Sequence, residues 1–391
     1  MSAPARAEAY AEARPLWADI DLDAITHNLA LVRERAGRPV RILAAIKANA
    51  YGHGVEAVAL HLQSAGVDGL ATANLDDALM ARRAGVSIPI LIYGSALPGG
   101  LELLLAHDLT PSIWTQDALD AVSRLAAERG RTIAVHVKVD AGFGRIGVRL
   151  DAAAAFARAV IAAPGVQLEG MYTHLPFDGA AGAAWSSRRL SEFTSLLRQV
   201  ESQNGIVIEF TQAAASSILS EALPDSLTTI APGHLLFGLS PLAGRSAEEL
   251  GFRKALSALR TRLIHVGERR RGDDLLGAGP GGLAEDATVG VVLIGMDNGY
   301  RAVAASGAFM LCQGRRCPVL GVSAEYTVID LSAAPAAAVG DTVTIIGEDA
   351  DDAITVEWLA QQMGAPSAAY WMIGLRDVPM RYRASETLVQ P

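Results

Sequence analysis

Short apolar runs alternate with longer amphipathic stretches over much of the chain. From about residue 41 to residue 238, most β-prone apolar runs are followed by a stretch in which Ala, Leu and Arg recur at helical spacing. Such alternation is typical of strand–helix units that build a parallel sheet. The eight apolar runs read RILAAIKA, GLATAN, PILIYG, TPSIW, IAVHVKVD, LEGMYTH, EFTQAAA and TTIAPGHLLFG.

The intervening stretches predict helices over residues 55–66, 75–85, 116–130 and 187–202, where the apolar positions have amphipathic spacing. Eight strand–helix units of this length fit an α/β fold in which the sheet closes into a TIM-like (β/α)8 barrel. An open doubly wound sheet would produce a similar alternation, so the pattern alone does not decide whether the sheet closes.

A different pattern begins after about Lys254. Here β-like segments at 260–268, 288–296, 317–331 and 341–348 are joined by Gly/Asp turns. A chain of 391 residues also exceeds what a single core usually supports. We therefore predict a barrel domain over residues 16–250 and a C-terminal, mainly-β domain over residues 251–391.

Composition narrows the possible functions. A net charge of -9 without a basic stripe argues against a nucleic-acid partner. The N-terminus has no apolar signal region and no run suits a membrane span, so we expect a cytoplasmic protein without a membrane partner. Cys312 and Cys317 are too few for a disulfide framework and lack the histidines of a zinc site, so no metal is expected.

The stretch AAIKANAYGHG places Lys47 at the end of an apolar run. In a barrel, the loops after the carboxyl ends of the strands form the active site, so a lysine there has more weight than one elsewhere. Further polar or turn-forming residues follow the later strands in the same way: Lys138, Asp140, Arg145, His174, Ser216, Ser217, Pro232 and Gly233.

Each of these features also has an ordinary explanation, as a surface lysine, a turn, a half-buried histidine or a helix cap. Their occurrence at the same end of successive units favours a shared site. A lysine in a partly apolar pocket has a lowered pKa and can form a Schiff base, and Gly-rich loops with a helix N-terminus can bind a phosphate. Together these features suit pyridoxal 5'-phosphate.

Five blocks carry a family resemblance. They are LWADIDLDAITHNL, AAIKANAYGHG, VHVKVDAGFGRIGV, LEGMYTHL and APGHLLFGLSP. In order and spacing, from Leu16 to Arg381, they resemble the bacterial alanine racemases. The resemblance implies a pyridoxal-phosphate barrel, a C-terminal β domain and a head-to-tail homodimer whose active sites each borrow residues from the partner. The substrate it implies is a small-molecule amino acid.

The resemblance also implies residue roles. Lys47 would form the Schiff base and act as a base at Cα. Arg145 would lie near the phenolic oxygen of the cofactor, and Lys138 would occupy an often carbamylated position that orients this arginine. His174 would lie beside the ring. The groups that would hold the phosphate are Tyr51, Ser216 and the backbone of Gly233 and His234.

The chain departs from the family pattern on the substrate side. Racemisation needs an acid/base group on each face of Cα, and the family supplies the second as a tyrosine where this chain has Met296, in GMDNGYR. The family's arginine at the pyridine nitrogen corresponds to Ala231. The family's Cys-Met-Asp block reads Ser323-Ala324-Glu325 here, and a tyrosine near the C-terminal end corresponds to Arg376. The candidate substrate-binding residues, Met296, Ala324, Glu325 and Arg376, are therefore atypical.

Three functions remain open. The first is an atypical amino-acid racemase or epimerase that is not specific for alanine. The second is a non-racemising enzyme, a decarboxylase, an aldolase-like enzyme or a transferase, with Lys47 as its sole base. The third is a catalytically idle pyridoxal-phosphate-binding protein. Asp297, Tyr300 and Glu325 are candidates to replace the missing tyrosine, and strand alternation disfavours Asp297.

Overall fold

The protein is described by a computed structural model over residues 14–94, 97–175, 179–215, 226–240, 246–275, 283–301, 307–385 and 387–389. The chain divides into two compact units. The barrel unit is Ala24–Arg253. The β unit combines the segment that ends at Asp23 with the chain from Lys254 onward.

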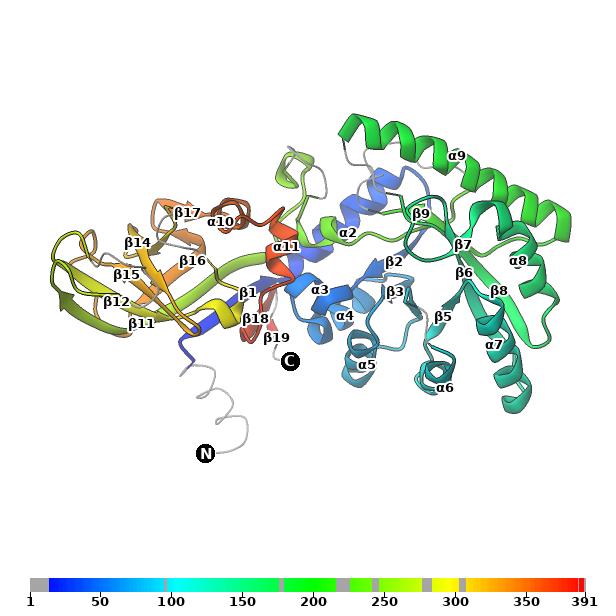
Figure 1. Ribbon diagram of the computed structural model, residues 1–391, viewed down its shortest axis with the longest axis horizontal. Coiled ribbons are helices and arrows are strands. Elements are labelled where there is room, and N and C mark those ends of the chain that lie inside the picture. Colours follow the sequence, from blue (N-terminus) through cyan, green and yellow to red (C-terminus); the bar gives the residue numbers. More distant parts are fainter. Residues whose placement is uncertain are drawn as a thin grey trace. The chain divides into compact units, whose positions relative to one another are not determined.

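The barrel unit contains a closed parallel sheet (Figure 1). Its strands in the described ranges are β2 (Arg41–Ala45), β3 (Gly69–Thr72), β4 (Ile90–Ile92), β5 (Thr110–Ile113), β6 (Ile133–Asp140), β8 (Val166–Tyr172), β9 (Phe210–Ala214) and β10 (Thr229–Ile230). Each of these overlaps one predicted apolar run. Since β5 pairs with β6 and β10 pairs with β2, the sheet closes on itself. The predicted (β/α)8 barrel is confirmed, and the open sheet is excluded.

Helices follow most of these strands. In the described part of this unit they are α2 (Leu22–Ala36, which begins in the β unit), α3 (Lys47–Gly52), α4 (Val55–Ser64), α5 (Leu75–Ala84), α6 (Leu101–Ala106), α7 (Gln116–Arg129), α8 (Leu150–Ala162) and α9 (Gly179–Asn204). Shorter elements are η1 (Pro98–Gly100), β7 (Val148–Arg149), η3 (His234–Phe237) and η4 (Glu248–Leu250). None of the described helices combines the length and apolar character of a membrane span.

Local sequence explains where the predicted helices begin and end. The side chain of Asn74 accepts a hydrogen bond from Asp76 N at the start of α5, and Gly85 ends that helix in the left-handed conformation. Thr115 and Gly130 do the same for α7. Polar N-caps satisfy amide groups that the helix leaves unpaired, and a left-handed glycine ends a helix at little steric cost.

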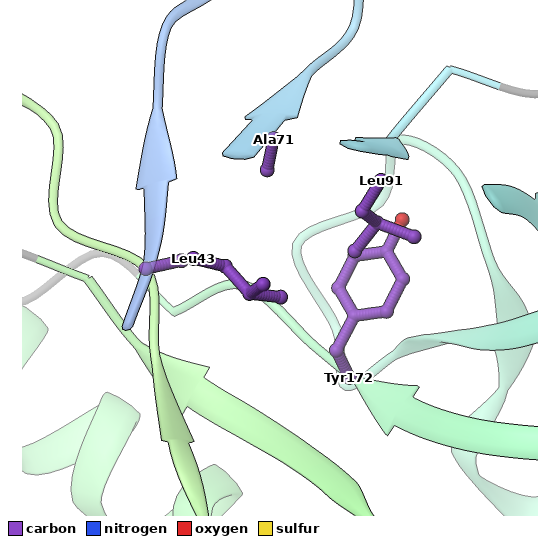
Figure 2. Packing of buried hydrophobic residues seen from close by; sticks show 5 residues of the cluster. Leu43, Ala71, Leu91 and Tyr172 are labelled. Atoms are coloured by element: carbon purple, nitrogen blue, oxygen red, sulfur yellow. The ribbon is translucent and has the colours of Figure 1, made fainter. Parts of the chain in front are cut away.

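Apolar side chains from several strands fill the barrel interior. Leu43, Ala71, Leu91 and Tyr172 come from β2, β3, β4 and β8 and form a buried cluster with Ala231 (Figure 2). All five are at most 6% exposed. Burial of about 25 cal/mol per Å² of apolar surface makes this cluster a substantial contribution to the stability of the barrel.

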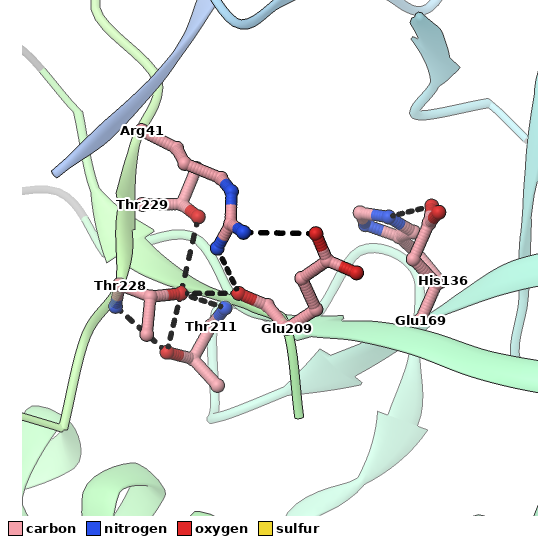
Figure 3. A network of polar contacts seen from close by, with 7 residues as sticks. All are labelled: Arg41, His136, Glu169, Glu209, Thr211, Thr228 and Thr229. Atoms are coloured by element: carbon pink, nitrogen blue, oxygen red, sulfur yellow. Dashed lines mark hydrogen bonds and ion pairs between the residues drawn. The ribbon is translucent and has the colours of Figure 1, made fainter. Parts of the chain in front are cut away.

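A group of polar contacts lies outside this apolar cluster (Figure 3). Arg41, the first residue of β2, forms an ion pair of 2.8 Å with Glu209, and Thr228 Oγ1 donates to Glu209 O at 2.7 Å. On the neighbouring strands, His136 Nε2 lies 3.0 Å from Glu169 Oε2. Arg41, Glu209 and Thr228 lie at or just before the starts of β2, β9 and β10, whereas His136 and Glu169 lie in the middle of β6 and β8. The amino ends of barrel strands support stability rather than catalysis.

The β unit is mainly β, as predicted. Its described strands are β1 (Leu16–Asp21), β11 (Leu256–Arg269), β12 (Ala287–Leu293), β13 (Phe309–Cys312), β14 (Arg315–Val322), β15 (Tyr326–Asp330), β16 (Thr342–Asp349), β17 (Asp352–Ile354), β18 (Met380–Ala384) and β19 (Thr387–Val389). Because β11 pairs with both β12 and β16, six of these strands form a ring in the order β16-β13-β14-β15-β12-β11. Its short helical elements are η5 (Met296–Asn298), α10 (Val356–Gln362) and α11 (Ala368–Met372).

The predicted start of the barrel domain at residue 16 is wrong. Strand β1 pairs with β11 and β18 and therefore belongs to the sheet of the β unit. A strand followed directly by α2 has the local pattern of a strand–helix unit, so the sequence places it with the barrel. Its partners lie more than two hundred residues further along the chain, and local periodicity does not detect such pairing.

Candidate active site

The charged residues predicted at the barrel strand ends converge. The pKa of His174, just after β8, is lowered to about 3. Burial is the main cause, and repulsion from the protonated forms of Lys138, Lys47, Arg145 and His234 contributes in this order. Three of these residues, Lys138, Arg145 and His174, also line one pocket at the carboxyl end of the barrel, together with Phe143. The carboxyl end of the barrel therefore carries one cationic cluster.

Lys47 follows β2 after a single residue, Ile46. The residue is exposed, so a ligand can reach it, but its pKa is lowered by the protein atoms around its amine and then by the Arg145 guanidinium. A lowered pKa increases the fraction of neutral amine, which is the form that attacks an aldehyde or accepts a proton. Lys47 therefore has the properties of a reactive amine.

The chain makes an unusual turn directly after Lys47. Ala48, Asn49, Ala50 and Tyr51 all have φ near +54° and lie in the left-handed region. This conformation costs non-glycine residues roughly 1–2 kcal/mol each. The turn returns the ring of Tyr51 to within 5.6 Å of Lys47 Nζ. Nothing in the apolar periodicity predicts it.

Lys138 lies on β6, near its carboxyl end, and is only 5% exposed. Burial and then the Arg145 charge lower its pKa to about 7, although Asp140 opposes the shift. Its Nζ lies 4.4 Å from the centroid of the Tyr172 ring. Near neutral pH this position therefore holds a buried amine that loses its proton easily.

Tyr51, Gly233 and His234 also lie together, on the Lys47 side of the cluster. A Cβ atom on Gly233 would lie 2.2 Å from the Tyr51 hydroxyl oxygen, so only glycine fits there. The ring centroids of Tyr51 and His234 are 4.9 Å apart. Burial and the Lys47 charge lower the pKa of His234 to about 4, so this imidazole is neutral at physiological pH.

The Gly-rich loop after β6 is organised by Asp140. Its carboxylate accepts hydrogen bonds from Gly142 N at 2.9 Å and Gly144 N at 3.1 Å. This role is structural rather than chemical. Phe143, inside the loop, lies 5.0 Å from the Arg145 guanidinium and packs its ring edge-on against His174. Sequence reasoning missed Phe143; the signal was an aromatic residue in the middle of a glycine loop.

Ser216 and Ser217 lie outside the described residues. The predicted substrate-side residues all belong to the β unit: Met296, Ala324, Glu325 and Arg376. The β unit brings three of their segments together, since Asp297 N donates to Ala324 O at 2.9 Å and Asn298 Nδ2 donates to Arg376 O at 3.2 Å. Met296 is 51% exposed. These residues form one exposed surface, which we call the Met296 surface.

The candidates to replace the missing tyrosine differ in accessibility. Tyr300 is completely buried, so its hydroxyl cannot act on a substrate without a rearrangement. Asp297 and Glu325 are both exposed. Contrary to the prediction from the sequence, strand alternation does not disfavour Asp297, because Met296–Asn298 is a 3-10 helix in which side chains do not alternate.

Replacing Lys138 with methionine is expected to stabilise the cofactor-free protein by about 1–3 kcal/mol near pH 6, because a buried charge is removed. Since the pKa falls from 10.5 to about 7 on folding, the unfolded chain binds the extra proton between these values. The stability contributed by Lys138 therefore rises with pH, and the advantage of Lys138→Met should shrink toward about pH 9.

Urea unfolding of the cofactor-free protein at both pH values measures this difference. Lys254→Met is the matched control, since Lys254 lies in the β unit and pairs there with Glu357. An advantage for Lys138→Met that is equal at the two pH values would contradict the assignment of a buried, readily deprotonated amine.

Comparison with known proteins places the chain in a family. Two family models match the chain, the alanine racemase N-terminal domain over residues 20–241 and the alanine racemase C-terminal domain over residues 257–382. The alanine racemase of Desulfovibrio desulfuricans is 32% identical over 338 residues, which cover 85% of this chain and 90% of that protein.

Solved structures of racemases also match the chain. Alanine racemase from Bacillus anthracis, with bound L-Ala-P, has a TM-score of 0.84 and 26% identity, and the match covers 96% of this chain and 97% of that one. Histidine Racemase from Leuconostoc mesenteroides has a TM-score of 0.81 at 24% identity over 95% of this chain and 99% of that one, and it shares the fold. The chain therefore belongs to the alanine racemase family, whose members are pyridoxal-phosphate-dependent racemases, and is an enzyme of this isomerase class.

Proposed function

We propose that this protein is a pyridoxal-phosphate-dependent enzyme that acts at Cα of an amino acid other than alanine, as an atypical racemase or epimerase. The observation that carries the proposal is the placement of Lys47. It is an accessible amine at a barrel strand end, the Arg145 charge helps to lower its pKa, and its own charge helps to keep His234 neutral. A family built on a lysine-bound cofactor uses an amine of this kind.

The residues of the barrel mouth fit the proposed cofactor. Lys47, Lys138 and Arg145 give the site a positive charge that suits an anionic phosphate and a phenolic oxygen. Because Gly233 has no Cβ, the Tyr51 hydroxyl lies directly against its backbone, so that a hydroxyl and backbone groups can face a phosphate together. In this assignment Tyr51, Gly233 and His234 hold the phosphate, together with Ser216.

The cofactor, when bound, supplies an aldehyde for Lys47 and an electron-withdrawing ring that stabilises negative charge at Cα. Lys47 in its neutral form then removes or returns the proton at Cα on one face. Arg145 would meet the phenolic oxygen, and the Phe143 ring lies 5.0 Å from its guanidinium. Lys138 would orient this arginine in the carbamylated form that the family resemblance implies. His174 stays neutral beside the ring, since its pKa is about 3.

The residue Ala231 favours a difference in how the cofactor's ring stabilises negative charge at Cα. In the family pattern an arginine at this position faces the pyridine nitrogen, but Ala231 is part of the buried apolar cluster with Leu43, Ala71 and Leu91. Its side chain offers no hydrogen-bond donor. We propose that the pyridine nitrogen is protonated more readily here, which would stabilise negative charge at Cα more strongly than in the family pattern.

The Met296 surface supports a different substrate. We propose a cytoplasmic homodimer in which the β unit of each protomer completes the partner's site, so that Met296, Ala324, Glu325 and Arg376 meet the substrate. Glu325 and Arg376 are charged and exposed, which favours an amino acid with a polar or charged side chain. The fold itself does not fix the substrate, since Histidine Racemase shares it.

A second candidate is a non-racemising enzyme in which Lys47 is the only base. The observation that favours it is Met296, because a thioether cannot transfer a proton. Decarboxylation, aldol-type cleavage and group transfer all need a stabilised Cα anion but do not need a second proton donor on the opposite face.

Exchange of the Cα proton in D2O separates the two candidates. The holoenzyme is incubated with a panel of L- and D-amino acids, followed by mass spectrometry and chiral analysis. We expect deuterium incorporation with loss of chirality for a polar or charged amino acid and much slower reaction with alanine. Exchange with retained chirality, or release of CO2 or an aldehyde, would identify the one-base enzyme, and fast alanine racemisation would contradict the altered specificity.

A further inference from the structure

The left-handed turn Ala48–Tyr51 is the most strained described backbone near the barrel mouth. Four consecutive non-glycine residues in this conformation cost several kcal/mol in total, so the turn persists only if its surroundings hold it. It lies between Lys47 and the Tyr51–Gly233 contact. The direction of the Lys47 amine and the position of the Tyr51 ring both depend on it.

Asp77, from α5, is a hydrogen-bond partner of this turn. Asp77 Oδ1 accepts the backbone N–H of Asn49 at 3.1 Å, and Asp77 Oδ2 accepts the Thr72 hydroxyl at 3.3 Å. Asn49 Oδ1 in turn accepts Val55 N at 2.8 Å, at the start of α4. The turn is therefore tied to the next strand–helix unit on one side and to its own following helix on the other.

The ordinary role of a residue at this place in a helix is different. Asp77 is the third residue of α5, where an acidic side chain usually reaches back to the N–H of the N-cap residue. Here Asn74 N donates to Thr72 Oγ1 instead, at 3.1 Å. Both carboxylate oxygens of Asp77 therefore accept hydrogen bonds from groups other than the amide of its own N-cap residue. The residue is only 4% exposed.

We propose that Asp77 is a positioning residue for catalysis, which holds the strained turn and thereby directs Lys47 and Tyr51 toward the cofactor. The inference rests on the proposed function of Lys47 as the cofactor anchor. Burial opposes ionisation of Asp77 and raises its pKa, so the charged carboxylate is maintained here at a cost in stability. Such a cost is common where a side chain serves a functional site.

The test compares Asp77→Ala with Asp77→Asn, which keeps an acceptor oxygen in the same place, and with Asp76→Ala. Asp76 is exposed on the same helix and is the matched control for loss of charge. The first readout is backbone hydrogen exchange over residues 48–54 in the cofactor-free protein. The second is the rate at which pyridoxal phosphate becomes attached to Lys47, followed by borohydride reduction and peptide mapping.

For Asp77→Ala we expect about tenfold faster exchange over residues 48–54 and about tenfold slower attachment, as loss of a buried hydrogen bond implies. Asp77→Asn should largely restore both values, and Asp76→Ala should leave them unchanged. Asp77→Ser, which keeps a polar group but is too short to reach Asn49, serves if the alanine variant does not fold. Equal behaviour of the Asp77→Ala and Asp76→Ala proteins would overturn the inference. Failure of the wild-type protein to attach the cofactor at Lys47 would instead contradict the proposed function, and the exchange comparison would still decide the role of Asp77.

Discussion

Replacing Lys47 with alanine is expected to abolish both covalent attachment of pyridoxal phosphate and all turnover. The variant loses the amine that forms the bond and also the base that acts at Cα. Loss of a general base alone typically lowers the rate of turnover by a factor of about 100 to 10,000, and loss of the covalent anchor lowers it further. Absorption spectroscopy of the reconstituted protein and the Cα exchange assay measure the two effects separately.

The chain offers a stringent control because it contains only three lysines, Lys47, Lys138 and Lys254. Lys254 forms an ion pair with Glu357 in the β unit. Lys138 is the real competitor, since its pKa of about 7 makes it a good nucleophile, but it is nearly fully buried and Lys47 is exposed. Lys138→Ala should therefore retain the attached cofactor but lose activity, because Arg145 is no longer oriented. Cofactor on Lys138 in the Lys47→Ala protein would show that the anchor was misassigned.

The sequence predicts the barrel well because each strand and helix is encoded locally. Apolar runs and cap residues such as Asn74 and Gly85 lie next to the elements that they define. Closure was not predictable, since it depends on pairing between β2 and β10, and neither run encodes its partner. The same limit explains the error at Leu16–Asp21, whose sheet partners come from the distant end of the chain.

The candidate site shows the same division. Residues at strand ends, such as Lys47, Lys138 and His174, are predictable because the barrel topology brings all carboxyl ends to one face. The residues that hold them were missed, because their contacts depend on side-chain geometry and on an unusual backbone. Phe143 stacks against a neighbour in its own loop, and Asp77 reaches across to the turn after another strand.

The substitution Met296→Tyr is expected to raise racemisation by about 100-fold to 10,000-fold, the range that a positioned general acid or base contributes. The proposal assigns Met296 to the face of Cα opposite Lys47, in the place where the family pattern has a tyrosine. The residue is 51% exposed on a 3-10 turn, so a larger aromatic side chain does not have to be accommodated in a core. Chiral analysis of the product gives the rate in each direction.

Met296→Phe is the matched control, because it has the same ring and lacks only the hydroxyl. A gain that needs the hydroxyl should appear in Met296→Tyr alone and should depend on pH through an additional ionising group, since the proton is transferred by the phenol. An equal gain in both variants would indicate packing against the substrate instead. If neither variant gains, while Asp297→Asn or Glu325→Gln lowers racemisation in the wild-type background, an exposed carboxylate of the Met296 surface supplies the second proton.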